Sequence, residues 1–216
     1  MNTQPRNRQP SGTPTGGEFT TGARTEPDVA LTTASQVVPE ASSRPANFVV
    51  RTQGELDEVL ERHGSDPERT IVINSPRGVW LDIRETGSAF VEATDHASVR
   101  AFDHANVRVF DHATAIASGN ANVRATGNAN VLAYGDAHIQ ATDHVTVHAT
   151  NHATVTASEN ATVTAFGDVT VHATNHAAVR AYEDATVDAY GDATVDATGS
   201  VSVRLHSTQA NLQVWP

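Results

Sequence analysis

At 216 residues the chain has room for one ordinary globular domain with extensions, but its composition argues against an ordinary core. Aromatic residues make up 5% of the sequence, there is one methionine, and most apolar positions are Ala or Val, which are too small to fill a thick core. All fourteen basic residues are Arg, and twenty-five carboxylates give a formal charge of −11, which disfavours binding of bare nucleic acid or anionic membrane through a non-specific cationic surface.

The chain contains no cysteine, which excludes disulfides, thiol catalysis and cysteine-based zinc or iron–sulfur sites. Its first residues lack the apolar run of a signal peptide, and no run of eighteen apolar residues suggests a membrane span. The sequence therefore predicts a cytoplasmic protein that folds without a cofactor.

Residues 1–45 are rich in Thr, Pro, Gly, Ser, Asn and Gln with scattered charges. Such a segment cannot bury enough apolar area to offset the entropy of ordering the chain. We therefore expect a disordered tail over residues 1–45.

Residues 46–84 have a different character. NFVVRT, TIVINS and GVWLDI are strand candidates, and GELDEVLERHG carries Leu56, Val59 and Leu60 at helical spacing before Gly64. The segment is predicted to be a β-α-β-β unit. We expect it to cap one end of a repeat structure, because an uncapped end exposes backbone groups and apolar surface.

Residues 85–204 form fifteen consecutive octads without insertion or deletion, such as AFDHANVR, ATNHATVT and AYGDATVD. A period this strict indicates a stacked repeat. Position one is Ala in almost every octad, position five is Ala or Val, and position seven is nearly always Val, so these positions follow the two-residue period of a strand. Positions three and four hold turn formers such as DH, NH, GN and GD. The sequence predicts an all-β fold, a parallel β-solenoid in which each octad is a short strand and a corner.

Two octads would close one sixteen-residue coil, and roughly seven coils would stack at about 4.8 Å each. A triangular coil of three octads is the alternative, but Ala and Val are too small to fill its wider interior. Residues 205–216 leave the repeat, and their larger side chains are predicted to form a C-terminal cap over the last coil, namely Leu205, Leu212, Val214 and Trp215.

Several segments resemble known repeat families. The ATVxAxxx octads, PRGVWLDI (residues 76–83), VRLHS (residues 203–207) and GTPTGGEF in the tail resemble uncharacterised octapeptide-repeat solenoid proteins of actinobacteria and their phages. The segments Thr154-Val155-Thr156 and Thr162-Val163-Thr164 resemble, more distantly, the repeats of bacterial ice-nucleation proteins. Both resemblances imply a solenoid fold, and neither brings catalytic residues to this chain.

Histidine recurs at position four, and in a sixteen-residue coil His96 and His112 would stack on one corner. Two imidazoles about 5 Å apart are candidates for sharing a transition metal. Position four also holds Asn and Asp in other octads, whereas a metal site needs a fixed set of converging ligands. We therefore expect this position to form turns, with adventitious binding of nickel or zinc as the alternative.

The outward positions two, six and eight supply a candidate binding face. Aromatic residues at position two of alternate octads would lie on one face and could contact sugars or a protein, and threonines in the middle of the repeat could form an ice-binding array. The candidate residues are Phe102, Tyr134, Phe166, Tyr182, Thr154, Thr156, Thr162 and Thr164.

No Ser-His-Asp set or pair of carboxylates stands apart from the repeat, and no inserted loop builds a cleft, so we expect no enzyme activity. The sequence favours a scaffold or protein-binding module whose ligand is a protein partner or a second copy. One alternative is an ice-binding protein, which needs a flat face dominated by threonine. The other is an acidic DNA mimic, which needs carboxylates at phosphate-like spacing along the rod. Arginines early in the repeat and carboxylates at its end would also suit head-to-tail association or a basic partner.

Overall fold

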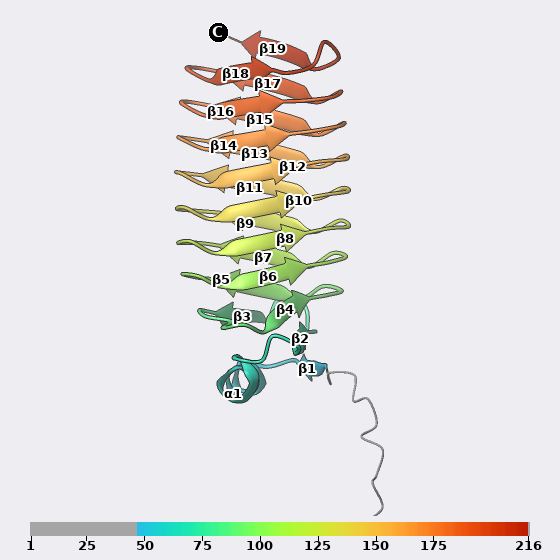
Figure 1. The fold of residues 1–216 in the computed structure, drawn as a ribbon, viewed down its shortest axis with the longest axis vertical. Helices are drawn as coiled ribbons and strands as arrows, with labels where there is room; N and C mark the ends of the chain where they lie inside the picture. The colour runs from blue at the N-terminus through green and yellow to red at the C-terminus, as the bar shows by residue number, and fades with distance from the viewer. Residues whose placement is uncertain (1–46, 216) are drawn as a thin grey trace, which may run out of the picture. The chain divides into compact units, whose positions relative to one another are not determined.

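The computed structural model describes residues 47–215, which form a parallel β-solenoid (Figure 1). From β2 onward, successive strands alternate between a ten-stranded sheet, here called sheet A, and a nine-stranded sheet, here called sheet B; β1 also lies in sheet A. Neighbouring strands in each sheet run parallel. This confirms the predicted fold class. The disordered tail predicted for residues 1–45 lies outside the described residues.

Sheet A contains β1 (Phe48–Val50), β2 (Thr70–Ile73), β4 (Phe90–Ala93), β6 (Asn106–Val109), β8 (Asn122–Ala125), β10 (His138–Ala141), β12 (Thr154–Ala157), β14 (Thr170–Ala173), β16 (Thr186–Ala189) and β18 (Ser202–Leu205). Sheet B contains β3 (Trp80–Ile83), β5 (Ser98–Ala101), β7 (Thr114–Ala117), β9 (Asn130–Ala133), β11 (Thr146–Thr150), β13 (Thr162–Phe166), β15 (Ala178–Tyr182), β17 (Thr194–Thr198) and β19 (Asn211–Trp215).

The strand register confirms two octads per coil. His138 pairs with Thr154 in sheet A, and Thr146 pairs with Thr162 in sheet B, sixteen residues apart in each case. From β2–β3 to β18–β19 each coil gives one strand to each sheet, which makes nine coils. That number exceeds the roughly seven expected from the octads alone, because residues 70–83 and 211–215 contribute further strands.

Positions one, five and seven of the octads point into the narrow space between the sheets. Ala153, Val155 and Ala157, which represent these positions in one coil, are fully buried. The interior is therefore a stack of small side chains, each packed against its equivalent one coil away. Because a sixteen-residue coil has so thin an interior, Ala and Val suffice to fill it.

Position three of every octad has a positive φ. Eight of these fifteen residues are Asp, Asn or Glu, and the other seven are Gly. Asp and Asn tolerate this backbone region better than most residues, and Gly enters it without a Cβ penalty. The sequence predicted turn formers at positions three and four, and the structure assigns the left-handed conformation to position three.

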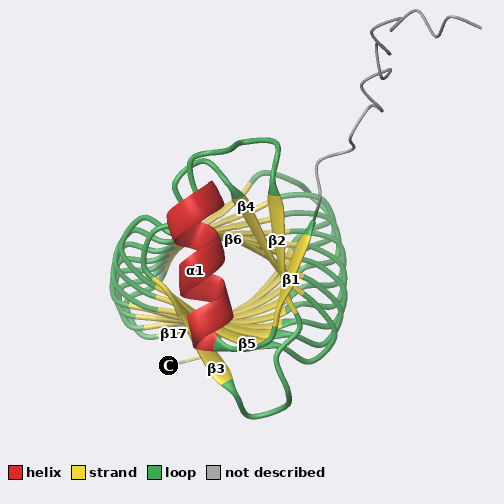
Figure 2. Ribbon diagram, turned by 90° about the horizontal axis from the view of Figure 1, so that it is seen from below, coloured by secondary structure: helices red, strands yellow, loops and turns green. Residues whose placement is uncertain are grey.

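The N-terminal end of the rod is covered by helix α1 (Gln53–His63), which lies across the opening of the coils (Figure 2). Thr52 and Glu55 form a capping box at its start, and Gly64 ends it with an N–H that donates to the carbonyl of Leu60 (2.8 Å). Leu56 is fully buried against the first coil. In residues 47–215 no helix is long and apolar enough to cross a membrane.

The structure differs from the predicted bounds of the N-terminal and C-terminal caps. The sequence places strands β2 and β3 in a separate capping segment, but they lie in the same sheets as the octads and form the first coil. Their partners lie twenty and eighteen residues along the chain, since Ile71 pairs with Val91 and Leu81 with Val99, so extra loop residues hide the period.

The C-terminal segment is not a separate cap over the repeat. Strands β18 and β19 are themselves the last coil, and Leu212 lies over Val195 in the register of the preceding one. Within the described residues no further layer covers them, and Leu205, Val214 and Trp215 remain exposed.

Candidate functional site

The two sheets present different outward side chains. Position eight of sheet A is occupied in turn by Glu92, Arg108, Arg124, Gln140, Thr156, His172, Asp188 and Arg204. Arg108 and Arg124 are sixteen residues apart and therefore pair in register on adjacent strands. Arg100 is only eight residues from Arg108 and points from sheet B, where it forms an ion pair with Asp82 (2.7 Å).

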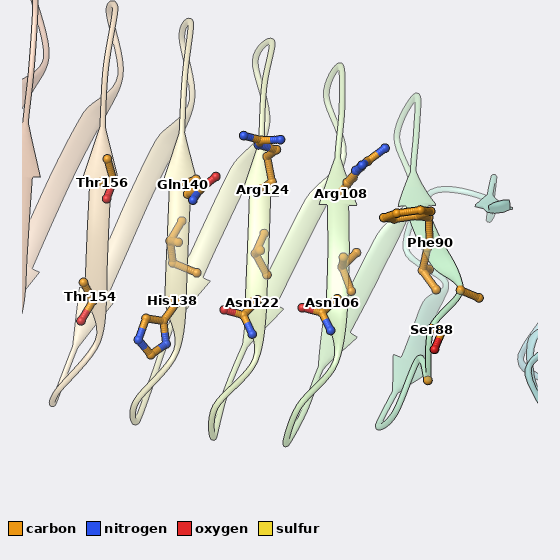
Figure 3. Close-up of a pocket in the computed structure, with 16 residues that line it drawn as sticks. Ser88, Phe90, Asn106, Arg108, Asn122, Arg124, His138, Gln140, Thr154 and Thr156 are labelled. Carbon is orange, nitrogen blue, oxygen red and sulfur yellow. The ribbon is translucent and has the colours of Figure 1, made fainter. Parts of the chain in front are cut away.

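A groove of about 660 Å³ crosses five strands of sheet A, from β4 to β12. Two rows of outward side chains line it, one at position six and one at position eight (Figure 3). The polar and aromatic lining residues are Ser88, Phe90, Asn106, Arg108, Asn122, Arg124, His138, Gln140, Thr154 and Thr156.

Phe90 and Arg108 form one end of the groove. Phe90 is 43% exposed, and the guanidinium carbon of Arg108 lies 4.5 Å from the centre of its ring. Nη1 of Arg108 also lies 3.3 Å from the carboxylate of Glu92 on the neighbouring strand. Ring and carboxylate together hold this guanidinium in place, and the ring keeps an exposed face beside it.

Arg124 is the exposed cation of the groove. It lies in register between Arg108 on β6 and Gln140 on β10, the two adjacent strands. Within residues 47–215 it forms no ion pair. The amides of Asn106 and Asn122 run parallel to the two arginines in the other row (Figure 3).

The groove has the opposite charge balance to the rest of the chain. Its lining residues include two arginines and no carboxylate, whereas the chain carries a formal charge of −11. Arg, Asn, Gln, His and Thr supply hydrogen-bond donors, and guanidinium groups bind carboxylates and phosphates through paired N–H groups. The groove is therefore suited to a ligand that carries negative charge and hydrogen-bond acceptors.

The four aromatic residues of the predicted face all lie at the end of a strand of sheet B or directly after it. The rings of Phe166 and Tyr182 stack with centroids 4.7 Å apart, and Phe102 lies under the guanidinium of Arg84. Ser118 and Thr150 occupy the equivalent place in the intervening coils. The aromatic residues thus form one stacked pair and two separate rings.

The four threonines of the predicted face do not share one sheet. Thr154 and Thr156 lie on β12 in sheet A, whereas Thr162 and Thr164 lie on β13 in sheet B. The eight candidate residues therefore occupy two faces, because an octad is half a coil. In strands β1–β19 each sheet has one strand with threonine at both outward positions, and neither face is dominated by threonine.

His96 and His112 lie on one corner, one coil apart, as expected, with ring centroids 5.4 Å apart and ring planes tilted by 53°. Nη2 of Arg77 lies 2.7 Å from Nε2 of His96, so a cationic group already occupies this side of the pair. Within residues 47–215 no three His, Cys, Asp or Glu side chains converge as a metal site would require. Adventitious binding of nickel or zinc stays a prediction.

Several carboxylates in the second half of the rod contact basic groups one coil away. His152 lies 3.4 Å from Asp168, His176 lies 3.5 Å from Asp192, and Asp188 contacts three basic side chains, those of His172, Arg204 and His206. A DNA mimic would instead present unpaired carboxylates in continuous rows.

The pKa of Asp66, in the loop after α1, lies below its ordinary value. The backbone N–H of Glu68 donates to its carboxylate at 3.0 Å, and Nε of Arg69 donates at 2.9 Å. These bonds shape the loop that leads into β2, away from the groove.

Reasoning from the sequence did not find the groove. The sequence shows the arginines as a cluster of charge early in the repeat, but it does not show which of them share a face until the number of octads per coil is known. Sorting outward residues by alternate octads would have placed Arg108, Arg124 and Gln140 in one row and Arg100 on the other side.

The fold and groove define a class, a parallel β-solenoid with octapeptide repeats and a cationic lateral groove. Comparison with protein-family models, with curated proteins and with solved structures found no match.

Proposed function

We propose that this chain is a non-enzymatic, rigid scaffold that binds a protein partner, and that the groove on sheet A receives an acidic segment of that partner. The observation that carries the proposal is the exposed Arg124 in a lining without carboxylates, beside an Arg108 whose partner Glu92 lies at the groove's edge, on a rod that is otherwise acidic. Such a contrast attracts an acidic segment to one location and repels it elsewhere.

The dimensions of the groove support an extended peptide as its ligand. Five adjacent strands span about 19 Å at the usual spacing between strands. That length corresponds to about six residues of extended chain. The lining side chains stand on consecutive hydrogen-bonded rungs, so the site is already formed before binding and little backbone order has to be created.

Regular placement of the titratable side chains supports a binding function over catalysis. In the octads the carboxylates and histidines occupy repeat positions, and the groove contains no nucleophile paired with a base. The ice-binding alternative has less support, because neither face is rich in threonine at both outward positions. The DNA-mimic alternative is weakened by the contacts between carboxylates and basic groups.

Fluorescence anisotropy with a labelled oligoglutamate peptide tests the proposal directly. Arg124→Glu reverses the charge of the groove's exposed cation, and we expect peptide binding to weaken at least tenfold, which corresponds to about 1.4 kcal/mol. Arg180→Glu is the matched control, because Arg180 is also exposed and also at position eight, but on sheet B. Circular dichroism checks that both variants remain folded.

Three outcomes would contradict the proposal. The first is no binding of the peptide by the wild-type protein at low salt. The second is equal weakening by Arg124→Glu and Arg180→Glu, which would indicate attraction by net charge alone. The third is binding of a polyuronate, but not of oligoglutamate, with the same dependence on Arg124, which would make the ligand an acidic glycan.

A further inference from the structure

The last coil differs from all the others in the exposure of its inward side chains. In the preceding coil Val187, Ala189 and Val195 are fully buried. In the last coil Leu205 is 43% exposed and Val214 is 65% exposed, although both occupy position one, which faces the interior elsewhere. Trp215, at the end of β19, is 57% exposed.

Three inward apolar residues of the last coil are also larger than their equivalents in the preceding coil. Leu205 is in register with Ala189, Leu212 with Val195, and Val214 with Ala197. A terminal coil that faces water favours polar substitutions at such positions. The substitutions here enlarge the apolar surface, which is typical of a surface that another molecule covers.

The backbone of the last coil is also unpaired at the C-terminal end of the rod, where the apolar residues are exposed. Strands β18 and β19 are the terminal strands of sheets A and B, and within the described residues each pairs only with the strand below it. Exposed strand edges bind other strands readily unless charge, proline or a bulge within the strand prevents it. Arg204 is the one charged residue in the two strands, and it occupies an outward position.

The other end of the rod matches the last coil less well as a partner surface. Helix α1 covers it, and the outer side of this helix carries the exposed charged residues Glu55, Asp57, Glu58, Glu61 and Arg62. Head-to-tail stacking would place the apolar coil against these charges. Of the two strand edges at that end, the edge of β1 is only three residues long, and the edge of β3 is partly occupied by the side chain of Gln53. A second C-terminal end, in contrast, offers matching apolar residues and matching edges.

The charges of the last coil permit this pairing. Its outward side chains are neutral or basic, namely Ser202, Arg204, Asn211 and Gln213. The nearest carboxylates at position eight, Asp188 and Asp196, lie one coil back, and Asp188 is in contact with Arg204. Two copies can therefore meet without bringing carboxylates face to face.

We infer that the C-terminal end formed by β18 and β19 is an interface at which two copies of this chain associate tail to tail. A two-fold axis reverses the direction of the strands, so those of one copy pair antiparallel with those of the other. The association stops at a dimer, because α1 closes the far end of each copy. This inference is independent of the groove on sheet A.

The first test is the mass of the 216-residue chain in solution, measured by light scattering over a concentration series. The wild-type chain is expected to be a dimer that dissociates on dilution. Val214→Asp places a charge in the interface and is expected to give the monomer mass at every concentration. Val49→Asp is the matched control, because Val49 lies in a strand at the other end and is 54% exposed, and it should leave the dimer intact.

The second test measures geometry and does not depend on a disruptive variant. Because the chain has no cysteine, single spin labels can be attached at Thr208→Cys, beside the last coil, or at Glu61→Cys, on α1. A tail-to-tail dimer gives a short distance between the two labels at position 208 and a distance of about two rod lengths at position 61. A monomer at all concentrations, a dimer unaffected by Val214→Asp, or a short distance at position 61 would overturn the inference.

Discussion

The two ends of the rod solve the same physical problem in different ways. Each end of a solenoid leaves two strand edges without partners and a layer of apolar side chains without cover. At the N-terminal end, β1 extends sheet A, and helix α1 covers the opening of the first coil. At the C-terminal end the described chain adds neither a further strand nor a helix.

Polar contacts complete the closure of the N-terminal end. The side chain of Gln53 pairs with the backbone of β3, since its Nε2 donates to the carbonyl of Asp82 (3.0 Å) and its Oε1 accepts from the N–H of Asp82 (2.7 Å). The carbonyl of Gly64 accepts hydrogen bonds from the N–H groups of Ser88 (2.7 Å) and Ala89 (3.0 Å). These bonds join the end of α1 to the corner between β3 and β4, here called the first corner. A solenoid end can therefore be covered by the chain itself. The exposed apolar residues of the last coil are thus particular to the C-terminal end and are not required by the solenoid fold.

The largest effect is expected from the apolar anchor of the helix. Leu56 is fully buried, so Leu56→Ala should lower the free energy of unfolding by about 3 kcal/mol through lost burial and the cavity left behind. Val214→Ala at the other end removes an exposed side chain and should change it by less than about 0.5 kcal/mol. Urea denaturation of dilute, monomeric protein measures both.

Equal losses for these two substitutions would mean that the C-terminal end is as well covered as the N-terminal end. Hydrogen exchange adds a local readout, because in Leu56→Ala the amides of β2 and β3 should lose protection before those of β10 and β11. Uniform loss along the rod would contradict a local closing role for α1.

Much of the fold could be predicted from the sequence, because it depends on which residue types each position of the repeat accepts. Inward positions had to be small and apolar, corners needed residues that tolerate positive φ, and the helix carried its own start and stop residues. The first coil was missed because loop residues between its strands break the period. The open end is not predicted by the sequence, because large apolar residues after a repeat indicate a cap equally well, and only the strand pairing shows that Val214 lies in the last coil.

The groove was harder to predict for a different reason. Which outward residues share a face depends on the number of octads per coil, and two or three octads give different groupings. With two octads Arg108 and Arg124 are neighbours, whereas three would have placed Arg100 beside Arg124. The predicted aromatic residues share one sheet because they come from alternate octads, whereas the predicted threonines come from consecutive octads and therefore lie on two sheets.

A smaller effect is expected at the corners of the two ends. Gly87 has φ of 58°, and a Cβ there would lie 2.3 Å from the carbonyl oxygen of Gly64. Gly87→Ala should therefore lower the free energy of unfolding by about 2 kcal/mol, from left-handed strain and forced separation of the first corner from α1.

Gly199 supplies the matched corner near the C-terminal end. Its φ is also positive, but the nearest atom to an added Cβ is 3.4 Å away, so Gly199→Ala should cost about 1 kcal/mol from the backbone alone. Thermal and urea denaturation measure the difference. Losses of the same size at both corners would show that the link between Gly64 and the first corner does not stabilise the N-terminal end.

The smallest effect, and the most specific, concerns the edge of sheet B. Gln53→Ala leaves the N–H and C=O of Asp82 without the partners that the side chain provides, so the free energy of unfolding should fall by about 1–2 kcal/mol. Gln213→Ala in the exposed terminal strand β19 should have almost no effect in the monomer.

Hydrogen exchange should show faster exchange of the Asp82 amide in Gln53→Ala. An unchanged exchange rate would mean that water replaces the glutamine side chain without loss of stability. In that case the N-terminal edge would be protected by the helix as a steric cover alone, and the two ends of the rod would differ in packing but not in the pairing of their backbone edges.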